Sequence, residues 1–365
     1  MFQSTFYILV FFSYAFWPFS ACSDSLKNDS PCPLSVVSVM WGEQTVDHPL
    51  IQALLEAPLM QRLQHIDQSG PVRYFGYAPA YSRYEHSVGV WALLKRFNCP
   101  FPEQVAGLLH DASHTVFSHV ADHLFAQPQS EYSYQDTIHL WFLDKMQVVP
   151  LISPYNLTLK QMDAENVSYR GLEQHLPDMC ADRIEYNLHT GLLFKRITKE
   201  ELIKILDDLR FENGQWFFVS ISSARKFADL SLYFTEYHWG AAWNLVFYHY
   251  FKEILQRAME LNLITRDHIH FSTDQKVVNI LLNAEVPYIQ KRLQACRCIH
   301  QSFTLVEGED YDLYFQPKFR GIDPLVSYNN ALYRLTTLDP SFNKAYHQLK
   351  EKCKKGYKIS LTILD

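Results

Sequence analysis

The sequence lacks an excess of basic charge. Its 365 residues carry 33 Lys and Arg against 39 Asp and Glu, and no stripe of basic residues gathers along the chain. Broad nucleic-acid binding depends on such a positive surface, so we expect no specific nucleic-acid partner. An anionic substrate would have to be met by local cations or by a metal ion.

Internal repeats and low-complexity segments are also absent, which excludes repeat architectures. Hydrophobic residues make up 48% of the chain, and the length allows one large domain or two smaller ones with a sizeable core. The composition therefore predicts a globular protein.

The seven cysteines lack the CxxC spacing typical of zinc sites. Cys296 and Cys298 are too close in sequence for an easy internal disulfide. If Cys22 is lipidated, the remaining six could pair in an oxidising compartment, and scattered reduced thiols are the alternative. The cysteines leave the compartment open.

The first 22 residues resemble an export signal, although they contain no Lys or Arg. The apolar run of residues 6–17 is shorter than a membrane span, and the FSAC that follows resembles a bacterial lipobox ending at Cys22. We predict a signal peptide or lipoprotein signal over residues 1–22 and a linker over residues 23–35. The protein would then be exported or tethered to a membrane through its N-terminus; otherwise the segment is an apolar terminal helix of a cytoplasmic protein.

Helical periodicity dominates the rest of the chain. Residues 48–70 begin with Pro49 at a favourable first-turn position, are interrupted at Pro58 and stop at Gly70. A capping box, TKEE, begins a helix at Thr198. Apolar residues three and four positions apart predict further helices in residues 83–97, 102–114, 136–147, 181–194, 222–239, 241–261 and 275–286.

Strand signals are few. Residues 34–42 are strand-like, and β-prone runs on both sides of Asn213-Gly214 predict a hairpin. Residues 311–326 and 357–365 also resemble strands. We therefore predict a mainly α protein, with a helical body over residues 36–295, one hairpin, and a small β-containing C-terminal appendage over residues 296–365.

Four residues with metal-ligating side chains are the strongest candidates for chemistry. The adjacent pair His110 and Asp111 ends an apolar helix, and alone it is weak evidence, because a helix-end His beside a capping Asp is also stabilised by the helix dipole. His86 lies in a helix whose other residues are mostly apolar, where a buried imidazole needs a partner. Asp182 begins another amphipathic helix.

Such a ligand set has nitrogen and oxygen donors and no sulfur. It suits one divalent ion, Mn²⁺, Fe²⁺, Mg²⁺ or Zn²⁺, and leaves coordination positions open for water and substrate. A metal held in this way can lower the pKa of a water molecule and polarise a phosphoryl oxygen. The set therefore predicts hydrolysis of a phosphate ester.

The order His86, His110-Asp111, Asp182 matches the H…HD…D signature of the HD-domain metal-dependent phosphohydrolases. Four longer blocks, QRLQHIDQSG, SRYEHSVGV, AGLLHDASHTVFSH and DMCADRIEYNLHTG, resemble the dNTP triphosphohydrolase branch, which includes the dGTPases and the vertebrate sterile-alpha-motif and HD-domain dNTPase. The resemblance covers about residues 40–290. It implies an HD-domain helical bundle that hydrolyses dNTPs, dGTP among them, to deoxynucleoside and triphosphate.

The resemblance also implies individual roles. The two His and two Asp of the signature would bind the metal. Gln68 and Tyr186 match positions that touch the sugar, although a Tyr on an apolar helix face is more often part of the core. Metal ligands would be His86, His110, Asp111 and Asp182; catalytic residues would be His114, His119 and Asp111; substrate contacts would be Arg83, Arg183, Gln68 and Tyr186.

Plain alternatives exist for the other members of that set. His114 and His119 could be polar residues on a solvated turn, and Arg83 and Arg183 could form surface ion pairs. Three further histidines have no matched role and are expected to be structural: His123, His139 and His175.

One departure from the branch concerns catalysis. Tyr134 stands where a second catalytic His is expected, and a shift in alignment could bring His139 there instead. A degenerate HD protein that binds a nucleotide or a partner without turnover is therefore one alternative. Another is a phosphatase or phosphodiesterase that acts on a different nucleotide. The resemblance also leads us to expect a homo-oligomer.

Overall fold

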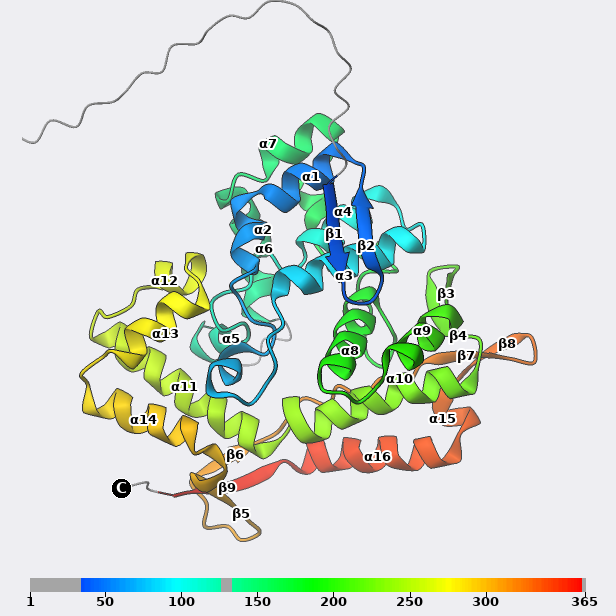
Figure 1. Cartoon of the computed structure of the whole chain (residues 1–365). Coiled ribbons are helices and arrows are strands. Elements are labelled where there is room, and N and C mark those ends of the chain that lie inside the picture. Colours follow the sequence, from blue (N-terminus) through cyan, green and yellow to red (C-terminus); the bar gives the residue numbers. More distant parts are fainter. Residues whose placement is uncertain (1–33, 126–132, 363–365) are drawn as a thin grey trace, which may run out of the picture. The chain divides into compact units, whose positions relative to one another are not determined.

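The computed structural model describes residues 34–125 and 133–362 of the chain (Figure 1). It confirms a mainly α-helical protein. The predicted export signal, its Cys22, and the linker as far as residue 33 lie outside the described residues. In the part of the chain that is described, no helix combines the length and the apolar character needed to span a membrane.

Helix α3 (Arg83–Arg96) lies at the centre of the described body, beside α4 and α8 (Figure 1). It begins with a capping box between Ser82 and Glu85. Its apolar residues face two cores, with Trp91 in one and Leu94 in the other. Residues 86–94 of α3 are all buried, and this burial fixes the position of His86.

The first half of the chain is mostly short helices. The predicted break at Pro58 is confirmed, because Ala57 takes the extended conformation that a following proline favours. The elements are β1 (Leu34–Ser38), β2 (Gly42–Val46), α1 (Pro49–Glu56), α2 (Pro58–Leu63), η1 (Gly70–Phe75), α4 (Phe101–Leu109), α5 (Val120–Phe125), α6 (Tyr134–Lys145), α7 (Val149–Ile152), η2 (Ser153–Tyr155), η3 (Leu159–Met162) and α8 (Ala181–Leu193).

The second half contains the longest helices. The predicted capping box at Thr198 is confirmed, and so is the hairpin, where Asn213 and Gly214 both have positive φ values of 52° and 73°. The elements are α9 (Lys199–Asp208), β3 (Leu209–Glu212), β4 (Gln215–Phe218), α10 (Ile221–Phe234), the π-helix η4 (Thr235–Trp239), α11 (Ala242–Glu260), α12 (Arg266–Phe271), α13 (Asp274–Leu282), α14 (Pro287–Arg297) and η5 (Ile299–Gln301).

The C-terminal region differs from the predicted appendage. Its strand β7 pairs in parallel with β4 of the body, which gives the sheet order β3-β4-β7-β8. The unpredicted helix α16 buries Phe342 and Leu349 in the same core as α10. The described residues from Leu34 onward therefore form one unit. The elements are β5 (Phe303–Val306), β6 (Leu313–Phe315), β7 (Leu325–Tyr328), β8 (Ala331–Arg334), α15 (Leu335–Leu338), α16 (Pro340–Lys355) and β9 (Tyr357–Leu361).

The cysteines that the structure describes are all free thiols. Most are buried in the packed body, which favours the reduced alternative over disulfide pairing. They are Cys99, Cys180, Cys296, Cys298 and Cys353.

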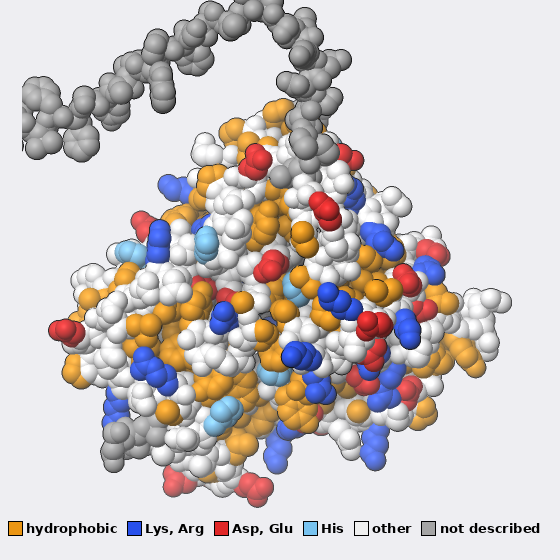
Figure 2. Space-filling view, viewed as in Figure 1, with side chains coloured by type: hydrophobic (Ala, Val, Ile, Leu, Met, Phe, Trp, Pro, Cys, Tyr) orange, Lys and Arg blue, Asp and Glu red, His pale blue; other side chains and the backbone are white. Residues whose placement is uncertain are grey.

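Charged side chains of both signs are intermingled on the face of the molecule shown in Figure 2. This face has no area of uniformly basic character, in keeping with the charge balance of the sequence.

Candidate metal centre and adjoining pocket

Three of the predicted ligands converge where α3, the end of α4 and the start of α8 meet. The Nε2 atoms of His86 and His110 lie 3.1 Å apart. Asp182 Oδ1 lies 2.9 Å from the first nitrogen and 3.6 Å from the second. The two imidazoles are buried and the carboxylate is partly open, so a ligand can reach the group from one side.

The hydrogen bonds on the far side of each ring determine what these Nε2 atoms can do. His110 Nδ1 donates to the carbonyl oxygen of Gly107 at 2.8 Å, and His86 Nδ1 donates to the Glu185 carboxylate at 2.5 Å. With the ring proton on Nδ1, each Nε2 presents a lone pair toward Asp182. Two lone pairs and one carboxylate oxygen at this spacing fit a divalent cation.

The charges around His86 also favour a bound cation. Burial alone would lower its pKa, but the carboxylates of Glu185, Asp182 and Asp111 outweigh burial and raise the pKa to about 10. The site is therefore rich in negative charge and attracts a cation, whether a proton or a metal ion.

Asp111 lies beside the three-residue group and is held by Arg83. Its carboxylate is 3.6 Å from the Nε2 atoms of both His86 and His110. Arg83 Nη1 donates to Asp111 Oδ2 at 2.5 Å, and its Nε donates to Ser118 at 2.7 Å. Burial would raise the pKa of Asp111, but Arg83 and the neighbouring histidines hold it well below the ordinary value.

Arg83 itself is only 1% exposed. Its guanidinium fixes the orientation of the Asp111 carboxylate, and its Nη2 lies 3.5 Å from Nε2 of the pocket-lining His119.

His114 also faces Asp111. Its Nε2 lies 3.2 Å from Asp111 Oδ1, while its buried Nδ1 has no hydrogen-bond partner among the described residues. Burial and the charge of Arg83 lower the pKa of His114 to about 3. The predicted helix through this residue ends at Leu109, so His114 lies on a buried turn rather than a solvated one.

Glu185 was not predicted, although it stands one turn after Asp182 on α8. Its Oε1 accepts a hydrogen bond from His189 Nδ1 at 2.8 Å, and its Oε2 accepts from His86 and from the Tyr81 hydroxyl. Carboxylates that orient a ligating histidine in this way tune metal sites. The three-residue spacing from Asp182 was the signal that could have identified Glu185.

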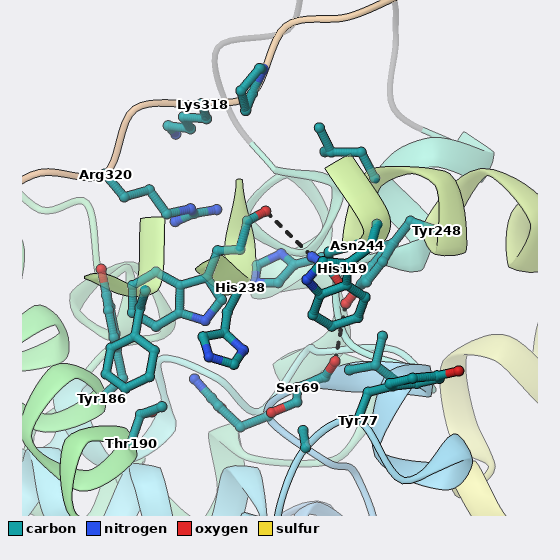
Figure 3. A pocket seen from close by; sticks show the side chains of 18 of the residues that line it. Ser69, Tyr77, His119, Tyr186, Thr190, His238, Asn244, Tyr248, Lys318 and Arg320 are labelled. Carbon is teal, nitrogen blue, oxygen red and sulfur yellow. Dashed lines mark hydrogen bonds between the residues drawn. The ribbon is translucent and has the colours of Figure 1, made fainter. Parts of the chain in front are cut away.

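A pocket of about 360 Å³ adjoins the metal centre (Figure 3). Three residues of the predicted site, Gln68, His119 and Tyr186, line it. His119 Nδ1 lies 3.2 Å from Asp122 Oδ2, and its Nε2 lies 3.5 Å from Arg83 Nη2. His119 is thus the predicted catalytic residue that both faces the pocket and contacts the residues around Asp111.

One wall of the pocket is aromatic. The π-helix η4 inserts an extra residue into the helical register, as π-helices at functional sites commonly do, and His238 and Trp239 from it line the pocket. Asn244 Nδ2 donates to the carbonyl oxygen of Trp239 at 3.3 Å, and Tyr248 donates to Ser69 at 3.2 Å, as Figure 3 shows. Further aromatic lining residues are Tyr77, Phe194, Phe234 and Trp243.

Arg183 is not among the pocket-lining residues. Its guanidinium donates to the carbonyl oxygens of Gln174 and Asp178 and lies 3.7 Å from Glu173 Oε2. These contacts stabilise the segment before α8 and leave the predicted phosphate contact of Arg183 outside the pocket wall.

Tyr134 and His139, the two candidates for the position of the second catalytic histidine, have side chains that lie outside the pocket lining. The Tyr134 hydroxyl lies 2.9 Å from His270 Nε2. His139 is buried between the Ser113 hydroxyl, at 2.9 Å, and the carbonyl oxygen of Met162, at 3.1 Å. Neither side chain lines the pocket.

Three further residues line the pocket although the sequence did not predict a role for them there. His123, expected to be structural, lines it. So do Lys318 and Arg320, which come from the segment between β6 and β7. Both cations lie in the segment KFRGIDPLV, which is itself similar to bacterial relatives, but they reach the pocket only through the long-range packing of the C-terminal region.

No model of a protein family matches the chain. The uncharacterized protein YdhJ of Bacillus subtilis is 29% identical over 331 residues, which cover 90% of this chain and 99% of YdhJ. The metal-dependent phosphohydrolase cns2 of Cordyceps militaris is 34% identical over 171 residues, 47% of this chain and 49% of cns2.

A shorter match joins the chain to the deoxynucleoside triphosphate triphosphohydrolase SAMHD1 of Danio rerio, with 31% identity over 132 residues. That match covers 31% of this chain and 21% of SAMHD1, so the chain spans about half of cns2 and about one fifth of SAMHD1. The crystal structure of a phosphohydrolase from Bacteroides thetaiotaomicron has the same fold, with a TM-score of 0.67 at 15% identity over 91% of this chain and all of that one.

Proposed function

Because the chain belongs to the HD-domain superfamily of metal-dependent phosphohydrolases, we propose that it hydrolyses nucleotide phosphates, with conversion of a dNTP to deoxynucleoside and triphosphate as the leading reaction. One observation carries the proposal: the lone pairs of His86 and His110 and the Asp182 carboxylate converge beside a pocket that offers aromatic and cationic side chains. The partial similarity to SAMHD1 supports the dNTP as substrate.

His86, His110 and Asp182, with Asp111 beside them, would hold a divalent ion, which would supply a Lewis acid for polarising a phosphoryl oxygen and acidifying water. The chain's own residues position this chemistry. Arg83 contacts one oxygen of the Asp111 carboxylate and His114 contacts the other, so the carboxylate keeps one orientation. Such rigid placement of charged groups is what stabilises a developing negative charge.

His119 is our candidate for the acid that protonates the leaving group. It faces the pocket, and its Nδ1 is hydrogen-bonded to Asp122, which orients the ring. His114 was the first candidate from the sequence, but it is buried behind Asp111 and does not line the pocket.

The pocket suits a nucleoside. Its volume lies within the range of small-molecule sites, and aromatic side chains such as Trp239 offer surfaces on which a base can stack. Tyr186 lies between this wall and the metal centre, with its ring centroid 5.2 Å from that of Trp239 and 6.5 Å from that of His86. A phenol at that place is positioned to contact the sugar, as is Gln68.

One observation favours a second candidate, nucleotide binding without turnover. Tyr134 takes the place expected for a catalytic His, and its hydroxyl bonds to His270, which does not line the pocket. If proton transfer depended on that missing imidazole, the chain would bind metal and nucleotide and release no product.

The test uses the full chain with Mn²⁺ and a panel of dNTPs, NTPs and nucleoside monophosphates. We expect triphosphate and deoxynucleoside from at least one dNTP. Asp182→Asn should lose both bound metal and activity, whereas Asp267→Asn, a matched change at an exposed residue of α12, should keep both. Full metal occupancy without product from any nucleotide would refute the proposed hydrolysis and favour nucleotide binding without turnover.

A further inference from the structure

Two cations at the rim of the pocket belong to a part of the chain far from the metal ligands. Lys318 and Arg320 lie on one segment between β6 and β7, and Figure 3 shows both on the same stretch of backbone, with the Arg320 side chain extended over the pocket. They are the Lys and Arg side chains among the pocket-lining residues.

The charges of both residues are available to a ligand. In residues 34–125 and 133–362, neither Lys318 nor Arg320 forms an ion pair or a side-chain hydrogen bond. The lining carboxylate, Asp122, is already engaged, since its Oδ2 pairs with His119 and its Oδ1 accepts a hydrogen bond from the Tyr134 backbone at 2.7 Å.

Lys318 is partly desolvated and lies among charges of both signs. Desolvation and the charges of Arg320 and Arg183 lower its pKa, and the carboxylates of Asp136 and Asp122 oppose that effect. Arg320 also acts on Tyr186 and Tyr248, since its charge opposes the rise in pKa that burial causes in both phenols. Arg320 lines the same pocket as both phenols, one of which, Tyr186, we place beside the sugar.

The two arginines that were expected to bind phosphate already have partners within the protein. Arg83 is bonded to Asp111 and Ser118, and Arg183 to backbone carbonyls and Glu173. A polyanionic substrate entering an acidic protein still needs cations, and the pocket offers them at Lys318 and Arg320.

We propose that Lys318 and Arg320 form a phosphate-binding subsite that makes the pocket select nucleotides with two or more phosphates over monophosphates. The proposal rests on the proposed function, which places a nucleotide in this pocket. The guanidinium fork of Arg320 suits two phosphate oxygens at once, and the Lys318 ammonium adds a mobile point charge. Phosphates beyond the one at the metal centre are the groups that such a subsite recognises.

The experiment compares Arg320→Gln, Lys318→Gln and the double variant with the wild-type full chain. Residues outside the pocket provide matched controls: Lys344→Gln at an exposed position, and Arg257→Gln at a partly exposed position paired with Glu260. Calorimetry on chelator-treated protein measures the Kd of dGTP and of dGMP apart from turnover, and steady-state kinetics with Mn²⁺ measures KM and kcat for dGTP.

We expect each single variant to weaken dGTP binding and raise its KM by about tenfold or more, because each loses a charge-assisted hydrogen bond. The Kd of dGMP should change less than about twofold, on the scale of an exposed charge. The controls and the bound-metal content should remain at wild-type values.

Two outcomes separate the subsite from the proposed function. If the wild type binds dGTP more tightly than dGMP and the double variant retains that preference, the subsite is wrong, whether or not the protein cleaves dGTP. If the preference disappears in the double variant but the wild type yields no product, the proposed subsite is supported and the proposed hydrolysis is refuted.

Discussion

Glu185 and His86 meet at the base of the metal centre, with Glu185 Oε2 2.5 Å from His86 Nδ1. Both side chains are almost completely buried, at 1% and 0% exposure. The carboxylate fixes the ring so that Nε2 points toward His110 and Asp182. The affinity of the site for metal therefore depends on a residue that is not a ligand.

Glu185→Gln should weaken metal binding by about 10- to 100-fold, because a neutral amide orients His86 less firmly and makes its ring a poorer donor. Elemental analysis after dialysis and a competitive chelator titration measure the change. Glu212→Gln on β3, an exposed residue, is the control. Wild-type affinity in Glu185→Gln would show that the carboxylate contributes packing only.

Gly70 should tolerate no side chain. Its φ of +66° is unfavourable for other residues, and a Cβ there would lie 2.7 Å from the Tyr248 hydroxyl and 2.8 Å from the Phe117 carbonyl oxygen. Gly76 has a φ of +83° and open space around it, so Gly76→Ala carries the same backbone strain without the contacts.

We expect Gly76→Ala to cost about 1 kcal/mol of unfolding free energy and Gly70→Ala about 1–3 kcal/mol more. Gly70→Ala should also displace Tyr248 from the pocket wall and weaken nucleotide binding. Urea denaturation of the two variants measures the difference, and equal costs would refute the close approach at Gly70.

His139 should make the protein sensitive to acid. Burial lowers its pKa from 6.5 to about 4, with a smaller opposing effect from the Met162 carbonyl. Between these values the unfolded chain binds the proton and the folded chain does not, so stability falls as the pH drops from about 6.5 to about 4. The expected slope from this one group is about 1.4 kcal/mol per pH unit.

The comparison with His139→Asn isolates that slope, because other titrating groups are common to both proteins. The variant should be less stable at pH 7, since the Ser113 and Met162 contacts are lost, and its deficit should shrink toward pH 4.5. A deficit that stays constant over this range would show that His139 is not held neutral.

Local patterns were enough for most helices, whereas the metal ligands were predicted from a family resemblance. Pro58, the capping box at Thr198 and the turn at Asn213 act on their own neighbours, so the sequence predicted their effects. His86, His110 and Asp182 were predicted to lie together because of their order in a resemblance, and the structure brings them within reach of one ion.

Long-range packing was not predictable in the same way. Helix α16 was missed, and residues 296–365 were separated from a body with which they share a sheet and a core. The same packing delivers Lys318 and Arg320 to the pocket, while the predicted Arg83 lies inward, bonded to Asp111. A sequence shows that a cation is present, but only the fold shows which charge it faces.

We propose that one divalent ion at His86, His110 and Asp182 is required for hydrolysis of a nucleotide phosphate. The most direct test removes metal from the full chain and returns Mn²⁺ stepwise, while bound metal and dNTP hydrolysis are measured on the same samples. We predict that the rate rises in proportion to occupancy and saturates at one tightly bound ion per chain. Hydrolysis that persists in excess chelator, or full occupancy with no hydrolysis, would contradict it.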